Sequence, residues 1–215
     1  MCYVLESFTE VSQSNIYTAG QAWCADSAAA WIEYGDVATW LTDSNSQYTT
    51  VTDLESVFQD CESGLNTDLS DWDTSRVTSM ATLFVNCYDY NQDHTGWDTS
   101  QVTDMYAMFY GTHAMNGDLS SFDTSKVTDF STMFVYSGFN QPLDAWDTSS
   151  GKDMSFMFST WSGVYVSLQL SIDNWDVSSV TNFQVLTPNH PSFYHFLTYS
   201  QLRKGETERE SLLNT

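Results

Sequence analysis

A nine-residue pattern that recurs along the middle of the chain constrains the fold more than any other feature of the sequence. The segment at 72–80, WDTSRVTSM, returns with changes at 97–105, 122–130, 146–154 and 175–183, so the leading aromatic residues are 25, 25, 24 and 29 residues apart. Such self-similarity is typical of a repeat protein, in which each unit buries its apolar face by stacking on its neighbours. We therefore predict a solenoid built from stacked coils.

Each repeat combines two kinds of apolar spacing. Val102, Met105, Met108 and Phe109 follow the spacing of one helical face, which predicts a short helix. Segments such as 118–122, with the sequence DLSSF, resemble short extended pieces that lead into the aromatic residue. The sequence therefore predicts an α/β solenoid of five to six coils, with one short strand and one short helix per coil.

The two ends of the chain depart from the repeat, as the caps of a solenoid do. An alanine-rich stretch at 19–34 predicts a cap helix that ends at Gly35. Val37 and Trp40 then resemble a degenerate first coil. We expect four parts: an N-terminal helical cap with a degenerate first coil at 1–45, the repeat solenoid at 46–186, a C-terminal cap at 187–202, and a disordered tail at 203–215.

The charge of the chain is strongly acidic. Asp and Glu number 28 against six Lys and Arg, so the formal net charge is −22. Such a body repels nucleic acid and anionic lipid headgroups, and we expect neither as a partner. No apolar run is long enough to span a bilayer, so we expect no membrane insertion. No signal peptide is visible at the N-terminus.

One aspartate follows the leading aromatic residue of each repeat. In stacked coils these carboxylates lie close enough to repel one another, so something must offset their charge. We favour the interpretation that each accepts hydrogen bonds from the following Thr and Ser backbone, as an Asx turn. The alternative is a bound Ca²⁺, since carboxylate oxygens suit that ion. The residues are Asp73, Asp98, Asp123, Asp147 and Asp176.

Two of the cysteines share one position of the repeat. Cys61 and Cys87 each lie three residues after the phenylalanine of their coil, at Phe58 and Phe84. Stacking therefore places them on neighbouring coils, close enough for a disulfide. The alternative is a column of small buried residues with two free thiols, because free cysteine is commonly buried.

Three tyrosines occupy positions where the other repeats carry smaller residues. Tyr106, Tyr110 and Tyr136 are not required by the repeat pattern, so they are candidates for contacts with a protein or a glycan. Ordinary lateral packing is the alternative. Catalytic motifs such as a nucleophile elbow or a phosphate-binding loop are not found in the sequence, and we expect neither an enzyme nor a cofactor.

The motif at 97–109, WDTSQVTDMYAMF, together with Phe139-Asn140, resembles the BspA-like surface-protein repeat, a leucine-rich-repeat-related unit that also occurs in mycoplasma lipoproteins. The resemblance covers about 16–186 and implies a right-handed solenoid of the leucine-rich-repeat type. It also implies an extracellular or cell-surface location and a noncatalytic role in binding or adhesion. A structural spacer without its own ligand is the alternative function.

Overall fold

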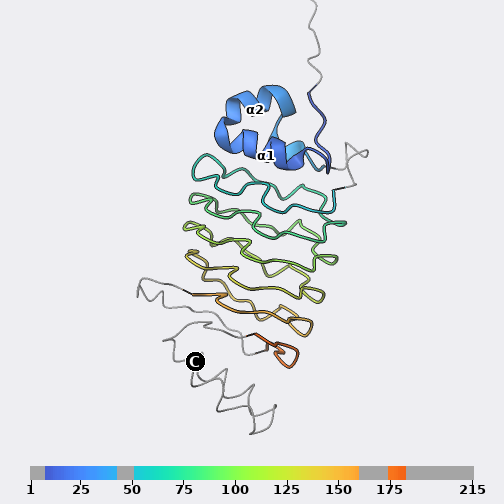
Figure 1. Cartoon of the computed structure of the whole chain (residues 1–215), viewed down its shortest axis with the longest axis vertical. Helices are drawn as coiled ribbons and strands as arrows, with labels where there is room; N and C mark the ends of the chain where they lie inside the picture. The colour runs from blue at the N-terminus through green and yellow to red at the C-terminus, as the bar shows by residue number, and fades with distance from the viewer. Residues whose placement is uncertain (1–7, 43–50, 160–173, 183–215) are drawn as a thin grey trace, which may run out of the picture.

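The computed structural model describes residues 8–42, 51–159 and 174–182. Within these ranges the helices are α1 (Ile16–Ala25), α2 (Ser27–Tyr34) and the 3-10 helix η1 (Val37–Thr39). The two α-helices lie at one end, and the repeats follow as successive turns of chain stacked along the long axis (Figure 1). Neither α-helix is long and apolar enough to cross a membrane, and no other helix in these ranges is. The predicted C-terminal cap and tail lie outside the described residues.

A line of parallel bridges joins one position of each coil to the next. It runs through residues 53, 79, 104, 129, 153 and 182. From 53 to 153, each of these positions precedes a buried Leu, Met or Phe, and all but 153 follow a Val-Thr pair. The expected strand segment at 118–122 carries none of these bridges. The extended contact between coils therefore lies at a different position of the repeat from the one predicted.

The short helix expected at 102–109 is a run of turns instead. Every second backbone N–H from 105 to 111 donates to the carbonyl 24 residues later, over 2.8–3.0 Å. The intervening N–H groups of 108, 110 and 112 donate to the carbonyl three residues earlier. In the four coils from 56 to 136, two positions per coil take a positive φ, for example Ala107 at 51° and Gly111 at 70°. A left-handed residue costs about 1–2 kcal/mol, and the hydrogen bonds between coils offset that cost.

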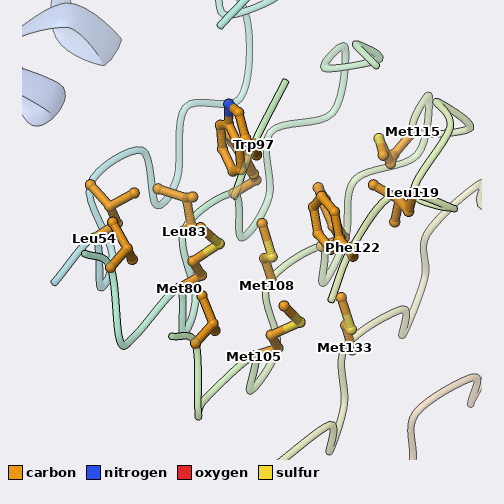
Figure 2. Close-up of a cluster of buried hydrophobic side chains, with 14 of the residues drawn as sticks. Leu54, Met80, Leu83, Trp97, Met105, Met108, Met115, Leu119, Phe122 and Met133 are labelled. Carbon is orange, nitrogen blue, oxygen red and sulfur yellow. The ribbon is translucent and has the colours of Figure 1, made fainter. Parts of the chain in front are cut away.

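The predicted buried face is nevertheless correct. Val102, Met105, Met108 and Phe109 are all fully buried, and Figure 2 shows side chains from successive coils meeting in one apolar interior. Aromatic rings form two columns along this core. Rings of the Trp column stack at 6.3–6.5 Å, and rings of the Phe column at 5.5–5.8 Å. The Trp column is Trp40, Trp72, Trp97, Phe122, Trp146 and Trp175, and the Phe column is Phe58, Phe84, Phe109, Phe134 and Phe158.

The N-terminal cap consists of two helices where one was expected, because Asp26 interrupts the run. Its carboxylate accepts hydrogen bonds from the N–H groups of Ala28 and Ala29 and so begins α2. Gly35, at φ 76°, ends α2 as predicted. The helix α1 seals the first coil, since the Gln21 side chain approaches three of its carbonyls at 3.1–3.3 Å.

Candidate functional site

The aspartates that follow the leading aromatic residues form turns in every described coil. Each carboxylate accepts a hydrogen bond from the backbone N–H of the serine two residues later, over 2.9–3.1 Å. For Asp123, bonds from both the side chain and the backbone of Ser125 lower the pKa of the carboxyl. The N–H of the intervening threonines at 74, 99, 124 and 148, which we also expected to donate, makes no such bond among the described residues. The five residues are Asp73, Asp98, Asp123, Asp147 and Asp176.

The other polar positions of the repeat also bond from coil to coil. The hydroxyls of the buried threonines at 74, 99, 124 and 148 donate to a carbonyl of the next coil over 2.9–3.0 Å. The asparagines at 66, 91 and 116 accept from the backbone N–H of the equivalent residue in the following coil over 2.8–2.9 Å. These side chains therefore hold the stack together.

A second acidic column, which the sequence patterns did not single out, runs along the line of bridges. Asp53, Asp104, Asp129 and Asp153 each accept from the N–H two residues later. Burial raises the pKa of Asp104, and the charges of Asp129 and Asp53 raise it further, whereas the N–H of Tyr106 lowers it. Across the described ranges, no group of three or more His, Cys, Asp or Glu side chains comes together to hold a metal ion.

The structure brings two of the three predicted tyrosines together. The rings of Tyr110 and Tyr136 meet edge to face at 5.8 Å, on neighbouring coils. Tyr106 stands apart from them and is 44% exposed. A further aromatic pair, Tyr88 stacked on His113 at 4.9 Å, lies close to them in sequence and was not predicted. Its signal was available, because both residues occupy the same position of successive repeats.

The disulfide prediction is wrong in its partner. Cys61 is bonded to Cys24 of α1, and Cys87 is a buried free thiol. The Cys87 thiol donates to the carbonyl of Phe58 at 3.0 Å. Burial raises the pKa of Cys87 to about 12. The disulfide between Cys24 and Cys61 therefore ties the cap to the first described coil.

One buried polar pair replaces an apolar pair of the repeat. The Tyr90 hydroxyl and His94 Nε2 are 3.0 Å apart, and both side chains lie in the aromatic core. The third repeat, which begins at Phe122, has Phe139 and Leu143 at these positions. His94 Nδ1 has no hydrogen-bond partner within the described part of the chain. This pair is a feature of the core, with no access for a ligand.

A cavity of about 320 Å³ opens between α1 and the first described coil. Ile16 and Val57 border it, but both side chains are buried in the contact between α1 and the coil. Tyr17, Asp53 and Glu55 surround it with an aromatic ring and two carboxylates. The sequence patterns missed this site because its two walls come from the cap and from the repeat.

The comparisons with known proteins give a family and no closer relative. The family described as "Mycoplasma protein of unknown function, DUF285" matches residues 33–138 and 118–201. No curated protein and no solved structure matches the chain. The two matched stretches overlap and together span most of the chain, including every described repeat. The chain therefore belongs to the DUF285 family of mycoplasma proteins of unknown function.

Proposed function

We propose that this chain is a noncatalytic binding or adhesion module that acts at the cell surface or outside the cell. We further propose that the chain folds as a right-handed solenoid of the leucine-rich-repeat type and that it is a BspA-like repeat protein. Its partner is a protein or a glycan. One observation carries it: the repeated polar side chains form hydrogen bonds within turns or between coils, whereas Tyr106, Tyr110 and Tyr136 form no side-chain hydrogen bond with the residues that the structure describes.

Tyr106 is exposed, whereas Tyr110 and Tyr136 are half-buried and contact each other at the surface. Tyr106 replaces an alanine at 81 and a serine at 131, yet the stacking of coils is the same at all three. Tyr110 and Tyr136 replace a valine and an asparagine of the preceding repeats. Exposed tyrosine offers a large rigid contact area with a hydroxyl for hydrogen bonding, which suits a binding surface.

The disulfide between Cys24 and Cys61 supports the proposed location. Structural disulfides persist in oxidising surroundings such as the cell surface and are rare in the cytosol. The net charge of −22 is compatible with the same setting, because it favours solubility of an exposed protein.

The experiment compares the parent protein with a variant in which each tyrosine takes the residue of another coil. The changes are Tyr106→Ser, Tyr110→Val and Tyr136→Asn, which the scaffold already accommodates at 131, 85 and 86. Ser121→Ala serves as the control, since the next repeat carries an exposed alanine at 145. Retention on arrays of surface proteins and glycans is measured for all three proteins.

We expect the tyrosine variant to lose at least tenfold in affinity for whichever ligand retains the parent, with an unchanged melting temperature. Equal retention of parent and variant on every ligand that binds would contradict the role of the tyrosines. No retention of the parent on any surface would favour the second candidate, a structural spacer of a larger surface protein.

A further inference from the structure

Three cysteines lie near one another where the cap meets the first described coil. Cys24 of α1 is bonded to Cys61, and Cys87 is a buried free thiol at the same position of the next coil. The thiolate of a cysteine beside a disulfide can attack one of its two sulfurs and take the place of the other. The arrangement of these three sulfurs therefore decides whether Cys61 can change its partner.

The Cys87 thiol lies close to the backbone of Cys61. Its Sγ donates to the Phe58 carbonyl at 3.0 Å, and the same oxygen accepts from the Cys61 N–H at 3.1 Å, so Cys87 Sγ is within about 6 Å of the Cys61 nitrogen. The two coils are also joined next to the cysteines, because the Asp60 N–H donates to the Val85 carbonyl at 2.8 Å. Backbones paired in this way are about 4.8 Å apart, and a disulfide needs Cα atoms about 4.4–6.8 Å apart. The separation therefore permits a disulfide between Cys61 and Cys87.

The two candidate partners of Cys61 lie on opposite sides of its coil. On one side α1 packs so closely that Gly20 leaves no room for a side chain against Val57. The coil of Cys87 packs on the other side, and Figure 1 shows the first described coil between α1 and the remaining coils. A thiolate attacks a disulfide sulfur from the side opposite the leaving sulfur. Cys87 therefore approaches Cys61 from the direction that expels Cys24.

We propose that the native disulfide exchanges within the chain, moving from the Cys24–Cys61 pair to the Cys61–Cys87 pair and freeing the cap from its covalent tie. The Cys87 thiolate attacks Cys61 Sγ, the bond between Cys61 and Cys24 breaks, and Cys24 leaves as a thiolate that takes up the proton given up by Cys87. The number of disulfides is unchanged, so no oxidant or reductant is consumed. The free thiol moves from the core to Cys24, which is half-buried in the cap. This exchange does not depend on the proposed binding surface.

Burial of Cys87 keeps the exchange slow at neutral pH. Burial raises the pKa of Cys87 to about 12, although the Cys61 N–H acts in the opposite direction. The other titratable groups that face Cys87 are Asp60, whose charge raises this pKa further, and Tyr90, which is neutral because burial raises its own pKa. The thiolate is the attacking form, and below the pKa its share rises about tenfold per pH unit. The rate of exchange should therefore rise with the same slope.

The experiment labels thiols of the full chain in a Cys2→Ser background, which leaves only these three cysteines. Protein with the native disulfide is incubated with iodoacetamide between pH 7.5 and pH 9.5, and peptide mapping follows the products with time. We expect label on Cys24 together with a new disulfide between Cys61 and Cys87. The rate should rise about a hundredfold across this pH range and should not depend on protein concentration.

Two variants in the same background separate attack by Cys87 from other routes. Cys87→Thr is the matched control, because Thr112 has this position in the next coil and its hydroxyl donates to the Phe84 carbonyl as the Cys87 thiol donates to that of Phe58. It keeps the hydrogen bond and removes the attacking sulfur, so Cys24 should stay unlabelled. Cys24→Ser tests the geometry directly, since its two remaining thiols should form an internal disulfide in a glutathione redox buffer. A thermal melt of each variant checks the fold.

Three results would overturn the proposal. Equal labelling of Cys24 in the parent and in Cys87→Thr would mean that the native bond opens without Cys87. No label on Cys24 at any pH, or a labelling rate that is the same across the pH range, would mean that the Cys87 thiolate does not attack. A Cys24→Ser variant that melts like the reduced parent, yet takes up glutathione at both thiols and forms no internal disulfide, would mean that Cys61 and Cys87 cannot be bonded.

Discussion

Replacing the buried Tyr90–His94 pair with the apolar pair of the third repeat should remove a specific pH dependence of stability. Burial lowers the pKa of His94 to about 3, although the nearby charges of Asp93 and Asp68 act in the opposite direction. Burial also raises the pKa of Tyr90 well above its usual value, so both groups are neutral in the folded protein. The double variant Tyr90→Phe/His94→Leu copies Phe139 and Leu143.

The direction follows from proton linkage. Unfolded His94 takes up a proton as the pH falls through about 6.5, whereas the folded form does so only near pH 3. The contribution of neutral His94 to stability is therefore fully present above pH 6.5 and is lost as the pH falls toward 3. Between pH 7 and pH 5 this one residue costs about 2 kcal/mol of unfolding free energy, and over its whole range about 5 kcal/mol.

Urea unfolding at pH 7 and pH 5, followed by tryptophan fluorescence, measures the effect. We expect the double variant to lose about 2 kcal/mol less than the parent between these pH values, because other carboxylates contribute equally to both proteins. At pH 7 it should be at least as stable, since it removes the unpaired Nδ1 of His94, and an unsatisfied buried group costs about 1–3 kcal/mol.

Two further variants complete the test. His94→Leu alone leaves the Tyr90 hydroxyl buried without its partner and should be less stable than the double variant by about 1–3 kcal/mol. His113→Gln changes an exposed histidine and should keep the pH dependence of the parent. A double variant with the same pH dependence as the parent would refute the reasoning, as would one that is much less stable at pH 7.

Other expectations follow from individual contacts. Peptide mapping should find Cys24 linked to Cys61, and Cys87 should resist iodoacetamide at pH 8 until the protein unfolds, since burial holds its pKa near 12. Thr99→Val should cost about 1–3 kcal/mol by leaving a carbonyl of the next coil unpaired, and Thr99→Ser should restore most of it; equal losses would contradict that role. Thr132→Gly should stabilise the protein by about 1 kcal/mol, because Thr132 has a left-handed φ of 58° that glycine adopts without strain. If Thr132 were in a helix, the same change would destabilise the protein. The melting temperature should be the same with Ca²⁺ and with EDTA at matched ionic strength, since each aspartate after a leading aromatic residue bonds to its own turn; a rise of several degrees with Ca²⁺ would restore the metal interpretation.

The periodicity of the sequence predicted which side chains are buried but not the conformation of the backbone. Val102, Met105, Met108 and Phe109 are buried as expected, because the spacing of apolar residues reports the direction of side chains. The same spacing fits a helix and a run of turns. The choice between them depends on carbonyls 24 residues away, which accept every second N–H. No local pattern contains that information.

The cysteine prediction failed for a related reason. Cys61 and Cys87 do occupy the same column, and the Cys87 thiol bonds to the carbonyl of Phe58 much as the Thr112 hydroxyl bonds to that of Phe84 one coil later. The disulfide partner came from α1, whose position against the first coil is not set by any repeat. Periodicity relates one coil to the next and says nothing about how a cap docks on them.

The same reasoning explains why the cavity beside α1 was not visible in the sequence. Within the repeat, a polar residue at a recurring position meets its own equivalents above and below, so the bonds it makes recur as well, as the threonine and asparagine columns do. Where the stack meets the cap, the first described coil lies against α1, and its residues at 53 and 55 line a cavity there. Gln13 supplies the backbone contacts that a preceding coil would have made, but its side chain is smaller than a coil and a cavity remains. In a stacked protein, side chains without equivalents above and below them therefore gather at the ends of the stack, where the repeat pattern cannot predict their contacts.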